Sequence, residues 1–233
     1  MTDQADICVV ISAGAEWRAV LPLFDCTQPE SSPYGEFFYQ PFNTNPVAFM
    51  HSGWGKVACA GATQYAIDRW QPRLLINLGT CGGVAGRVAV NNLILAQETI
   101  IYDIIEGMSG YQAAIDHYSV QANLGWLGDD LPFQVKRLKL YSADRDMRPE
   151  DVAGILRECD ASAADWESGA FAWVCARNHT DWLVLRAVTD LVSEGYGEAL
   201  GHADLWRQRT EAVMATLIDH LPWLIDRYEQ THL

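Results

Sequence analysis

Three continuous apolar runs constrain the fold of this chain more than any other feature of its sequence. They are ICVVIS at 7–12, RLLINLG at 73–79 and WLVLRAVTD at 182–190, and none alternates regularly between apolar and polar residues. A strand that faces water on one side alternates, whereas an unbroken apolar strand is buried on both faces, as in a parallel sheet covered by helices. The runs therefore predict central strands of a sheet that has helices on both sides.

Helical patterns and further strands separate these runs. The expected helices are 15–24, 57–70, 149–160, 168–178 and 205–228, the last broken near Pro222. The expected additional strands are a hairpin within 37–51 and strands within 91–104, 136–144 and 161–168, while 107–130 is a loop with a short helix. This alternation predicts a three-layer α/β/α fold with a mixed, parallel-rich central sheet.

Length and composition indicate one globular domain. The chain has 233 residues, 49% of them hydrophobic, and contains no linker, repeat or low-complexity stretch. A chain of this size buries a substantial core. We expect residues 1–233 to form a single domain.

The charge balance and the apolar pattern exclude several function classes. A formal net charge of −14 disfavours broad nucleic-acid binding, because a phosphate backbone requires a basic face. No apolar run approaches the roughly 20 residues that span a bilayer, and the N-terminus lacks the pattern of a signal peptide. We expect a cytoplasmic protein with no nucleic-acid or membrane partner.

The cysteines and histidines do not predict a metal site. The chain has six cysteines but no CxxC spacing, no HxH and no HExxH. Four of the cysteines lie among apolar or small residues, where a free thiol behaves as a small hydrophobe. We expect structural thiols, no metal and no cofactor.

Two glycine-rich segments indicate that the backbone approaches a small ligand. GWGKVA at 53–58 has the wrong spacing for a phosphate-binding P-loop, and GTCGGVAG at 79–86 lacks the GxGxxG pattern of dinucleotide sites. Both follow apolar runs, and α/β sheets bind ligands at strand ends. We expect tight turns there, with Gly79–Gly83 offering backbone N–H groups.

Five segments, in order, resemble the nucleoside phosphorylase superfamily, and within it the 5′-methylthioadenosine/S-adenosylhomocysteine nucleosidases. They are VVISAGAEWRAV, SGWGKVACAGAT, INLGTCGG, ADWESGAFAWVC and LVLRAVTDL, at 9–20, 52–63, 76–83, 164–175 and 183–191. The resemblance covers most of the chain and is weakest in the middle third. It implies hydrolysis of the N-glycosidic bond of a purine nucleoside, as in methionine salvage.

Three acids stand where apolar strands are expected to end, which suits this chemistry. Cleavage of an N-glycosidic bond gains from an acid that protonates the purine and a base that activates water. By resemblance Asp190 is the acid, Glu16 is the base and Glu167 accepts hydrogen bonds from the ribose hydroxyls. The alternatives are an N-cap for Asp190, a helix-dipole acid for Glu16 and a solvated surface position for Glu167.

The resemblance also implies further substrate-binding positions. Arg186 is interpreted as a residue that supports the site rather than a ligand group. Trp166 lies against the sugar or belongs to the core, and the Thr80 hydroxyl lies near the sugar and the water. The complete set of predicted substrate-binding residues is Glu167, Trp166, Thr80, Gly82, Trp54, Thr189 and Met147.

Water is preferred over phosphate as the nucleophile. Phosphorylases of the superfamily place arginines around phosphate, yet Asn77 occupies one such position and no GDPxR segment exists. The rival interpretation is a phosphorylase that uses Lys56, Arg87 or Arg145 for phosphate. A second rival is a non-catalytic nucleoside-binding or storage protein.

The substrate's base and 5′ group stay open, as does the assembly. The loop that supplies an aromatic residue against adenine in the family reads SADRDM here (Ser142–Met147), with Asp146 at the aromatic position. Futalosine-like compounds, deoxyadenosine and other purine nucleosides therefore remain candidates. The family's homodimers predict a partner contact in ETIIYDIIEGMSGY at 98–111, with a sheet strand followed by a surface loop as the alternative.

Overall fold

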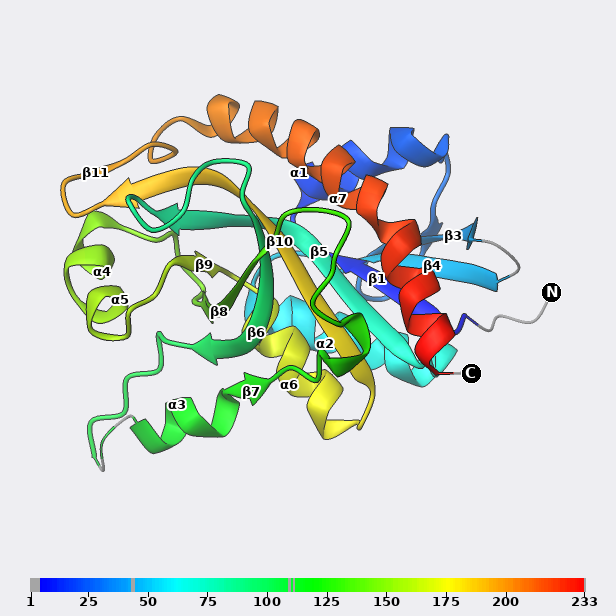
Figure 1. Ribbon diagram of the computed structural model, residues 1–233, viewed down its shortest axis with the longest axis horizontal. Coiled ribbons are helices and arrows are strands. Elements are labelled where there is room, and N and C mark those ends of the chain that lie inside the picture. The colour runs from blue at the N-terminus through cyan, green and yellow to red at the C-terminus, as the bar shows by residue number, and fades with distance from the viewer. Residues whose placement is uncertain (1–4, 43–44, 109, 111, 233) are drawn as a thin grey trace.

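The predicted apolar runs form neighbouring strands at the centre of one sheet (Figure 1). The computed structural model describes residues 5–42, 45–108, 110 and 112–232. β1 (Ile7–Ile11) pairs in parallel with β4 (Asn45–His51) and with β5 (Leu74–Val84). β5 pairs in parallel with β10 (Asp181–Ser193), so all three apolar runs are adjacent.

The remaining strands make the sheet mixed, as predicted. β10 is antiparallel to β6 (Leu93–Ile101), β6 is parallel to β8 (Lys136–Ser142), and β8 is parallel to β9 (Ala163–Asp165). β9 returns antiparallel to β5, which closes these strands into a ring. β3 (Glu36–Phe42) pairs with β4 and with the edge strand β2 (Glu30–Ser31), β11 (Tyr196–Gly197) is the opposite edge, and β7 (Val120–Gln121) pairs with β6.

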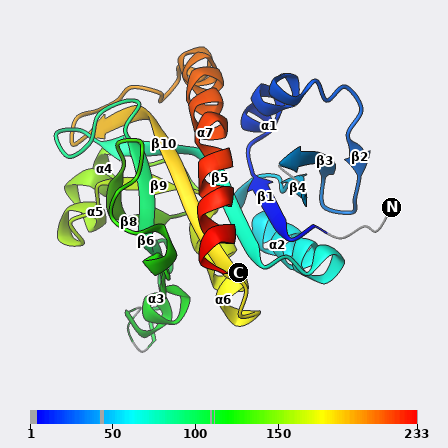
Figure 2. The ribbon, with the colours of Figure 1, turned by 45° about the vertical axis from the view of Figure 1, so that its right-hand side comes forward.

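Helices cover both faces of the sheet, which confirms the three-layer prediction (Figure 2). α1 (Gly14–Val20) and α7 (Ala203–Thr231) pack on one face. α2 (Gly55–Trp70) and α6 (Ser168–Arg177) pack on the other. The shorter helices are α3 (Gln112–Tyr118), α4 (Pro149–Ala153) and α5 (Ile155–Glu158), with 3-10 turns at Leu21–Phe24 and Gly125–Leu127.

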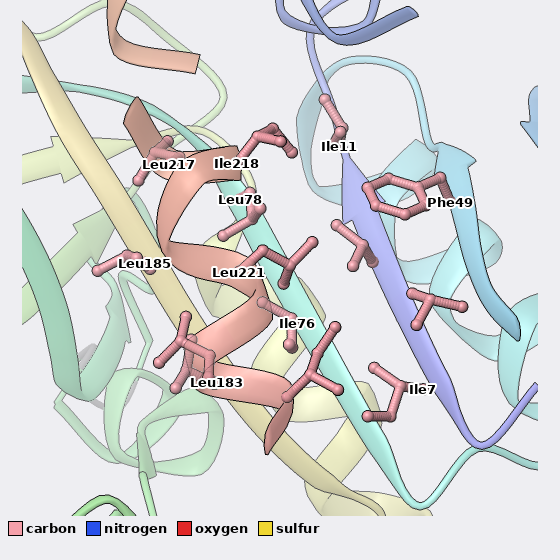
Figure 3. Packing of buried hydrophobic residues seen from close by; sticks show 14 of the residues in the cluster. Ile7, Ile11, Phe49, Ile76, Leu78, Leu183, Leu185, Leu217, Ile218 and Leu221 are labelled. Atoms are coloured by element: carbon pink, nitrogen blue, oxygen red, sulfur yellow. The ribbon is translucent and has the colours of Figure 1, made fainter. Parts of the chain in front are cut away.

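The absence of alternation in β1 has the predicted cause. Ile7 and Ile11 point into the layer between the sheet and α7, where Leu221 packs (Figure 3). Cys8 and Val10 point to the opposite layer, beneath α2 and α6. Each of these side chains is at most 2% exposed. Both faces of the strand therefore require apolar residues.

The predicted turn at Gly79–Gly83 is wrong, because β5 continues through it to Val84. The glycines are needed for close packing within a strand. A Cβ on Gly83 would lie 2.5 Å from Val88 Cγ2, and one on Gly79 would lie 1.9 Å from Arg186 Nη1. Glycine in a strand interior often marks such a close approach.

Other boundaries also differ from the predictions. β10 passes Asp190 and ends at Ser193, with a register shift between Val188 and Asp190. α7 continues through Pro222, whose side chain is exposed. The expected helix 149–160 divides at Gly154 into α4 and α5. The turn of the hairpin β3–β4, at Asn43 and Thr44, lies outside the described residues.

The cysteines are free thiols, as predicted. Cys8, Cys59, Cys81 and Cys175 are buried, whereas Cys159 is exposed. Burial raises the pKa of the Cys81 and Cys175 thiols well above their usual range, which keeps them protonated. Within the residues that the structure describes, no helix combines the length and apolar character needed to cross a membrane.

Candidate active site

A buried arginine forms the centre of a cluster of polar side chains at the ends of the central strands. Arg186 lies on β10 and is 0% exposed. Its Nε contacts Asp165 Oδ2 at 2.8 Å, and its Nη2 donates to Asn77 Oδ1 at 2.6 Å. Asn77 on β5 is itself held by a hydrogen bond from its Nδ2 to the Val10 carbonyl at 2.9 Å. The guanidinium is therefore fixed from two strands.

The segment between β9 and α6 brings two carboxylates to this arginine. Asp165 ends β9 and accepts hydrogen bonds from the hydroxyls of Ser142, at 2.6 Å, and Ser168. Glu167 precedes α6; its Oε1 accepts the Gly55 N–H at 3.0 Å, and its Oε2 lies 3.9 Å from Arg186 Nη2. Glu167 is 7% exposed, so the solvated surface position considered above is wrong.

Glu16 reaches the cluster from the first turn of α1. Its Oε1 accepts hydrogen bonds from both the backbone N–H and the hydroxyl of Thr80, at 2.6 and 2.8 Å. Its Oε2 accepts the Ala13 N–H at 3.0 Å, so the carboxylate also serves the helix N-terminus. The side chain is 2% exposed. Two parts of the predicted site, Glu16 and Thr80, are thus in direct contact.

The third guanidinium nitrogen of Arg186, Nη1, is available to donate a hydrogen bond. Nη1 is buried and has no hydrogen-bond partner among the described residues. It lies against Gly79, and the position of a Cβ on Gly79 is 3.0 Å from each Glu16 carboxylate oxygen. A buried donor without a partner is rare and calls for an explanation. Nη1 and Glu16 thus offer a donor and an acceptor to the same small space.

Asp190 is aimed by an irregularity in β10. The register shift between Val188 and Asp190 leaves Thr189 as an extra residue, and such bulges re-aim side chains next to active sites. Asp190 Oδ1 accepts a hydrogen bond from the Thr189 hydroxyl at 2.9 Å. Because Asp190 lies within the strand, the N-cap alternative is wrong.

Gly82 and Met147 lie beside this carboxylate. A Cβ on Gly82 would lie 3.8 Å from Asp190 Oδ2 and 3.0 Å from Met147 Cε. Met147 is 8% exposed and packs in the cluster around Tyr102, Tyr141 and Val192. The structure thus brings Gly82, Thr189, Asp190 and Met147 together.

β5 connects the two halves of the site. Glu16 contacts the strand at Thr80, and Asp190 approaches it at Gly82. Residues two apart on a strand point to the same face, and they are separated by roughly 7 Å. Glu16 and Asp190 therefore lie next to the same short part of β5, Glu16 at Thr80 and Asp190 at Gly82.

Burial shifts the proton affinities of two of these acids. Desolvation raises the pKa of Glu167, an effect that Arg186 opposes and that Asp165 and Glu16 reinforce. Desolvation also raises the pKa of Asp190; the Thr189 hydrogen bond opposes this, and the Glu198 charge reinforces it. Acids with raised pKa values in one cluster are typical of functional sites.

The predicted tryptophans lie at the margin. Trp166 is half-buried between Asp165 and Glu167. Trp54 is 70% exposed at the N-cap of α2, next to Gly55. The enclosed part of the cluster is therefore built from polar and small side chains.

The cations considered as phosphate ligands are engaged elsewhere. Lys56 Nζ lies 2.5 Å from Asp103, and Arg145 forms a two-point contact with Asp151. Arg87 Nη1 donates to the Ala161 carbonyl and lies 3.2 Å from Asp160 Oδ1.

Sequence reasoning missed the contacts that orient the cluster. Asp165, Ser142 and Ser168 were not singled out, and Asn77 was noted only as an absent arginine. The spacing Asp165–Trp166–Glu167 was the available signal, since two acids two residues apart around a strand end reach the same neighbour.

The chain is similar to known proteins in both sequence and fold. A family model described as "Phosphorylase superfamily" matches residues 6–219. A 5′-methylthioadenosine/S-adenosylhomocysteine nucleosidase of Staphylococcus haemolyticus is 25% identical over 183 residues, which are 72% of this chain and 80% of the relative. A structure of the Campylobacter jejuni 5′-methylthioadenosine/S-adenosyl homocysteine nucleosidase has a TM-score of 0.76 at 13% identity, covering 94% of this chain and 99% of its own. The corresponding Colwellia psychrerythraea nucleosidase, in complex with adenine, has a TM-score of 0.74 at 19% identity, covering 94% of this chain and 95% of its own.

Proposed function

The chain belongs to the phosphorylase superfamily, and from this premise we propose that it is a purine nucleosidase that hydrolyses the N-glycosidic bond of a 5′-methylthioadenosine/S-adenosylhomocysteine-like nucleoside. The observation that carries the proposal is the approach of Glu16 and Asp190 to one strip of β5, with Arg186 Nη1 beside Glu16. The reaction releases the free base and the free sugar, as in methionine salvage.

Asp190 is the general acid. Its raised pKa keeps the carboxyl protonated to higher pH than an exposed aspartate, so it can donate a proton to N7 of the purine. As the bond between the sugar C1′ and the base nitrogen breaks, its electron pair goes to the base. The donated proton neutralises that charge.

Glu16 and Arg186 hold the attacking water. Arg186 Nη1 donates to the water oxygen, and Glu16 accepts one of its protons as the oxygen bonds to C1′. The contacts of Thr80 keep the Glu16 carboxylate on this side of β5. The Arg186 charge is held by Asp165 and Asn77, so its position costs no reorganisation during the reaction.

Glu167 binds the ribose. Its Oε1 is held by the Gly55 N–H, and the carboxylate accepts hydrogen bonds from the vicinal hydroxyls. Thr80, Gly82, Met147, Thr189, Trp54 and Trp166 complete the substrate-binding set.

The charges around the site favour water over phosphate. The carboxylates of Glu16 and Asp165 lie close enough to Arg186 to interact with its charge, so a phosphate dianion meets two negative groups beside this cation. Lys56, Arg87 and Arg145 are each paired with a carboxylate. Asn77, in the position of a phosphorylase arginine, orients Arg186 instead.

We further infer that the protein acts in the cytoplasm as a single-domain homodimer. Trp54, Val57, Ile105 and Met108 are 70%, 86%, 91% and 98% exposed. The Lys56–Asp103 contact joins the two segments that carry these side chains, and exposed apolar side chains of this size are a feature of interfaces. Ser109 and Tyr111 of the predicted contact segment lie outside the described residues.

A nucleoside panel tests the activity. Purified protein is incubated with 5′-methylthioadenosine, S-adenosylhomocysteine, adenosine and inosine, with and without phosphate, and the free base is quantified. We expect phosphate-independent release of the base, reduced about 100-fold or more in kcat by Asp190→Asn and by Glu16→Gln. Strict phosphate dependence with a sugar 1-phosphate product would establish the phosphorylase alternative. Tight binding without turnover would establish the binding or storage alternative.

A further inference from the structure

The N-terminus of α2 is capped by carboxylates from distant parts of the chain. The N-cap residue, Trp54, provides no side-chain hydrogen bond. The Gly55 N–H instead donates to Glu167 Oε1 at 3.0 Å, and the Lys56 N–H donates to Asp144 Oδ1 at 2.7 Å. The first N–H groups of a helix have no partner within the helix and favour negative charge. Two adjacent amides thus bind the proposed ribose carboxylate and the loop after β8.

The Lys56 side chain also contacts the loop after β8, and it contacts the loop after β6 as well. Its Nζ lies 2.5 Å from Asp103 Oδ2 and 3.3 Å from Asp144 Oδ2. The Asp144 N–H also donates to Asp103 Oδ2, at 3.0 Å. The Lys56 side chain is only 19% exposed, so these contacts are partly shielded from water. One residue therefore joins α2 to the loops that follow β6 and β8.

Removal of the lysine charge would leave two carboxylates facing each other. Asp103 and Asp144 share the Lys56 ammonium group, and like charges in a partly buried site repel. Asp144 occupies the space that a side chain at position 55 would need, since a Cβ there would lie 2.8 Å from Asp144 Oδ1 and the φ of Gly55 is +81°. A shift of Asp144 would release the Lys56 amide, which is next to the Gly55 amide that holds Glu167.

We propose that Lys56 is a positioning residue that sets the orientation of Glu167 by holding Asp103 and Asp144 at the start of α2. This inference rests on the proposed function, because the ribose role of Glu167 is assigned there. The role differs from that of a phosphate ligand, since Nζ is engaged by the carboxylates. It also differs from a general stabilising role, since its effect must reach the substrate through the ribose hydroxyls.

The test compares substrates with and without those hydroxyls. Values of kcat/KM are measured for 5′-methylthioadenosine and its 2′,3′-dideoxy counterpart with wild type, Lys56→Met and Lys56→Arg. Lys139→Met is the matched control, because Lys139 pairs with Glu98 on β6 at 2.8 Å, outside the site. Circular dichroism checks that each variant is folded.

We expect Lys56→Met to lower kcat/KM about tenfold for 5′-methylthioadenosine and less than about twofold for the dideoxy compound. Lys56→Arg restores most of the selectivity, and Lys139→Met leaves it unchanged. An equal loss for both compounds, or no loss for either, would overturn the positioning role. If wild type hydrolyses neither compound, the proposed function fails. The effect of each variant on the Kd values of the two compounds then still decides the role of Lys56. If wild type binds the two compounds equally well, both the ribose role of Glu167 and the positioning role of Lys56 are overturned.

Discussion

Replacing Gly79 with alanine tests the position of Arg186 without removing a charged group. The added Cβ would lie 1.9 Å from Arg186 Nη1 and 3.0 Å from both Glu16 oxygens. Ordinary contacts of this kind begin near 3.4 Å, so the guanidinium must retreat by about 1.5 Å. It cannot do so freely, because Asn77 and Asp165 hold it and the side chain is 0% exposed.

The magnitude follows from these contacts. Overpacking of a buried site costs roughly 1–3 kcal/mol, and loss of one hydrogen bond to a charged group costs roughly 1.5–3 kcal/mol. We therefore expect Gly79→Ala to lower the free energy of unfolding by about 2–4 kcal/mol, and Tm by roughly 5–15 °C for a chain of this length. Displacement of a preorganised donor also lowers kcat/KM by about 100-fold.

Scanning calorimetry and steady-state kinetics measure both effects. Gly195→Ala is the matched control, since a Cβ there meets no atom within 4 Å; it should stay within about 0.5 kcal/mol of wild type. A Gly79→Ala protein with wild-type Tm and kcat/KM would refute the reasoning, because Nη1 would then not lie against Gly79.

Three further predictions concern titration and assembly. The Thr189 hydrogen bond lowers the pKa of Asp190, so Thr189→Val should raise that pKa further and move the alkaline limb of the kcat/KM profile to higher pH. The Glu198 charge acts in the opposite sense, so Glu198→Gln should move the limb to lower pH, and shifts in the reverse directions would contradict Asp190 as the acid. The pKa of Glu167 in the folded protein lies above its value in the unfolded chain, so the contribution of Glu167 to stability falls as pH rises between these two pKa values. Glu167→Gln should therefore flatten the fall of Tm above pH 5, and it should also lower kcat/KM. An unchanged slope of Tm against pH would argue against the burial of Glu167. Ile105→Glu, at a position 91% exposed, should shift the mass measured by light scattering from dimer to monomer, and a monomeric wild type would refute the homodimer.

Local pattern determined much of the fold and named the acids. The unbroken apolar runs predicted three adjacent central strands, because a strand covered on both faces needs apolar residues at every position. Motif order pointed to Glu16, Glu167 and Asp190. The inference about the strands succeeded because hydrophobic period is a property of short stretches of chain.

Local pattern failed where pairing between distant strands decides the geometry. GTCGG suggested a turn, because glycine permits sharp bends, but the chain stays extended: β10 and β9 pair along it, and Arg186 needs the space that a side chain would fill. Asp190 looked like the last residue of a strand, yet a bulge aims it from within one. Pro222 did not end its helix, which continues to Thr231 with its buried residues in the core on both sides of the proline.

The sequence by itself determined that three acids, Glu16, Glu167 and Asp190, follow or end apolar segments that were expected to be strands. Only the tertiary structure decided that Arg186 stands among them, held by Asn77 and Asp165, and that Lys56 joins two loops to α2. The physical reason is that such contacts link residues far apart along the chain. Their partners are set by the register of the whole sheet, which no single stretch of sequence encodes.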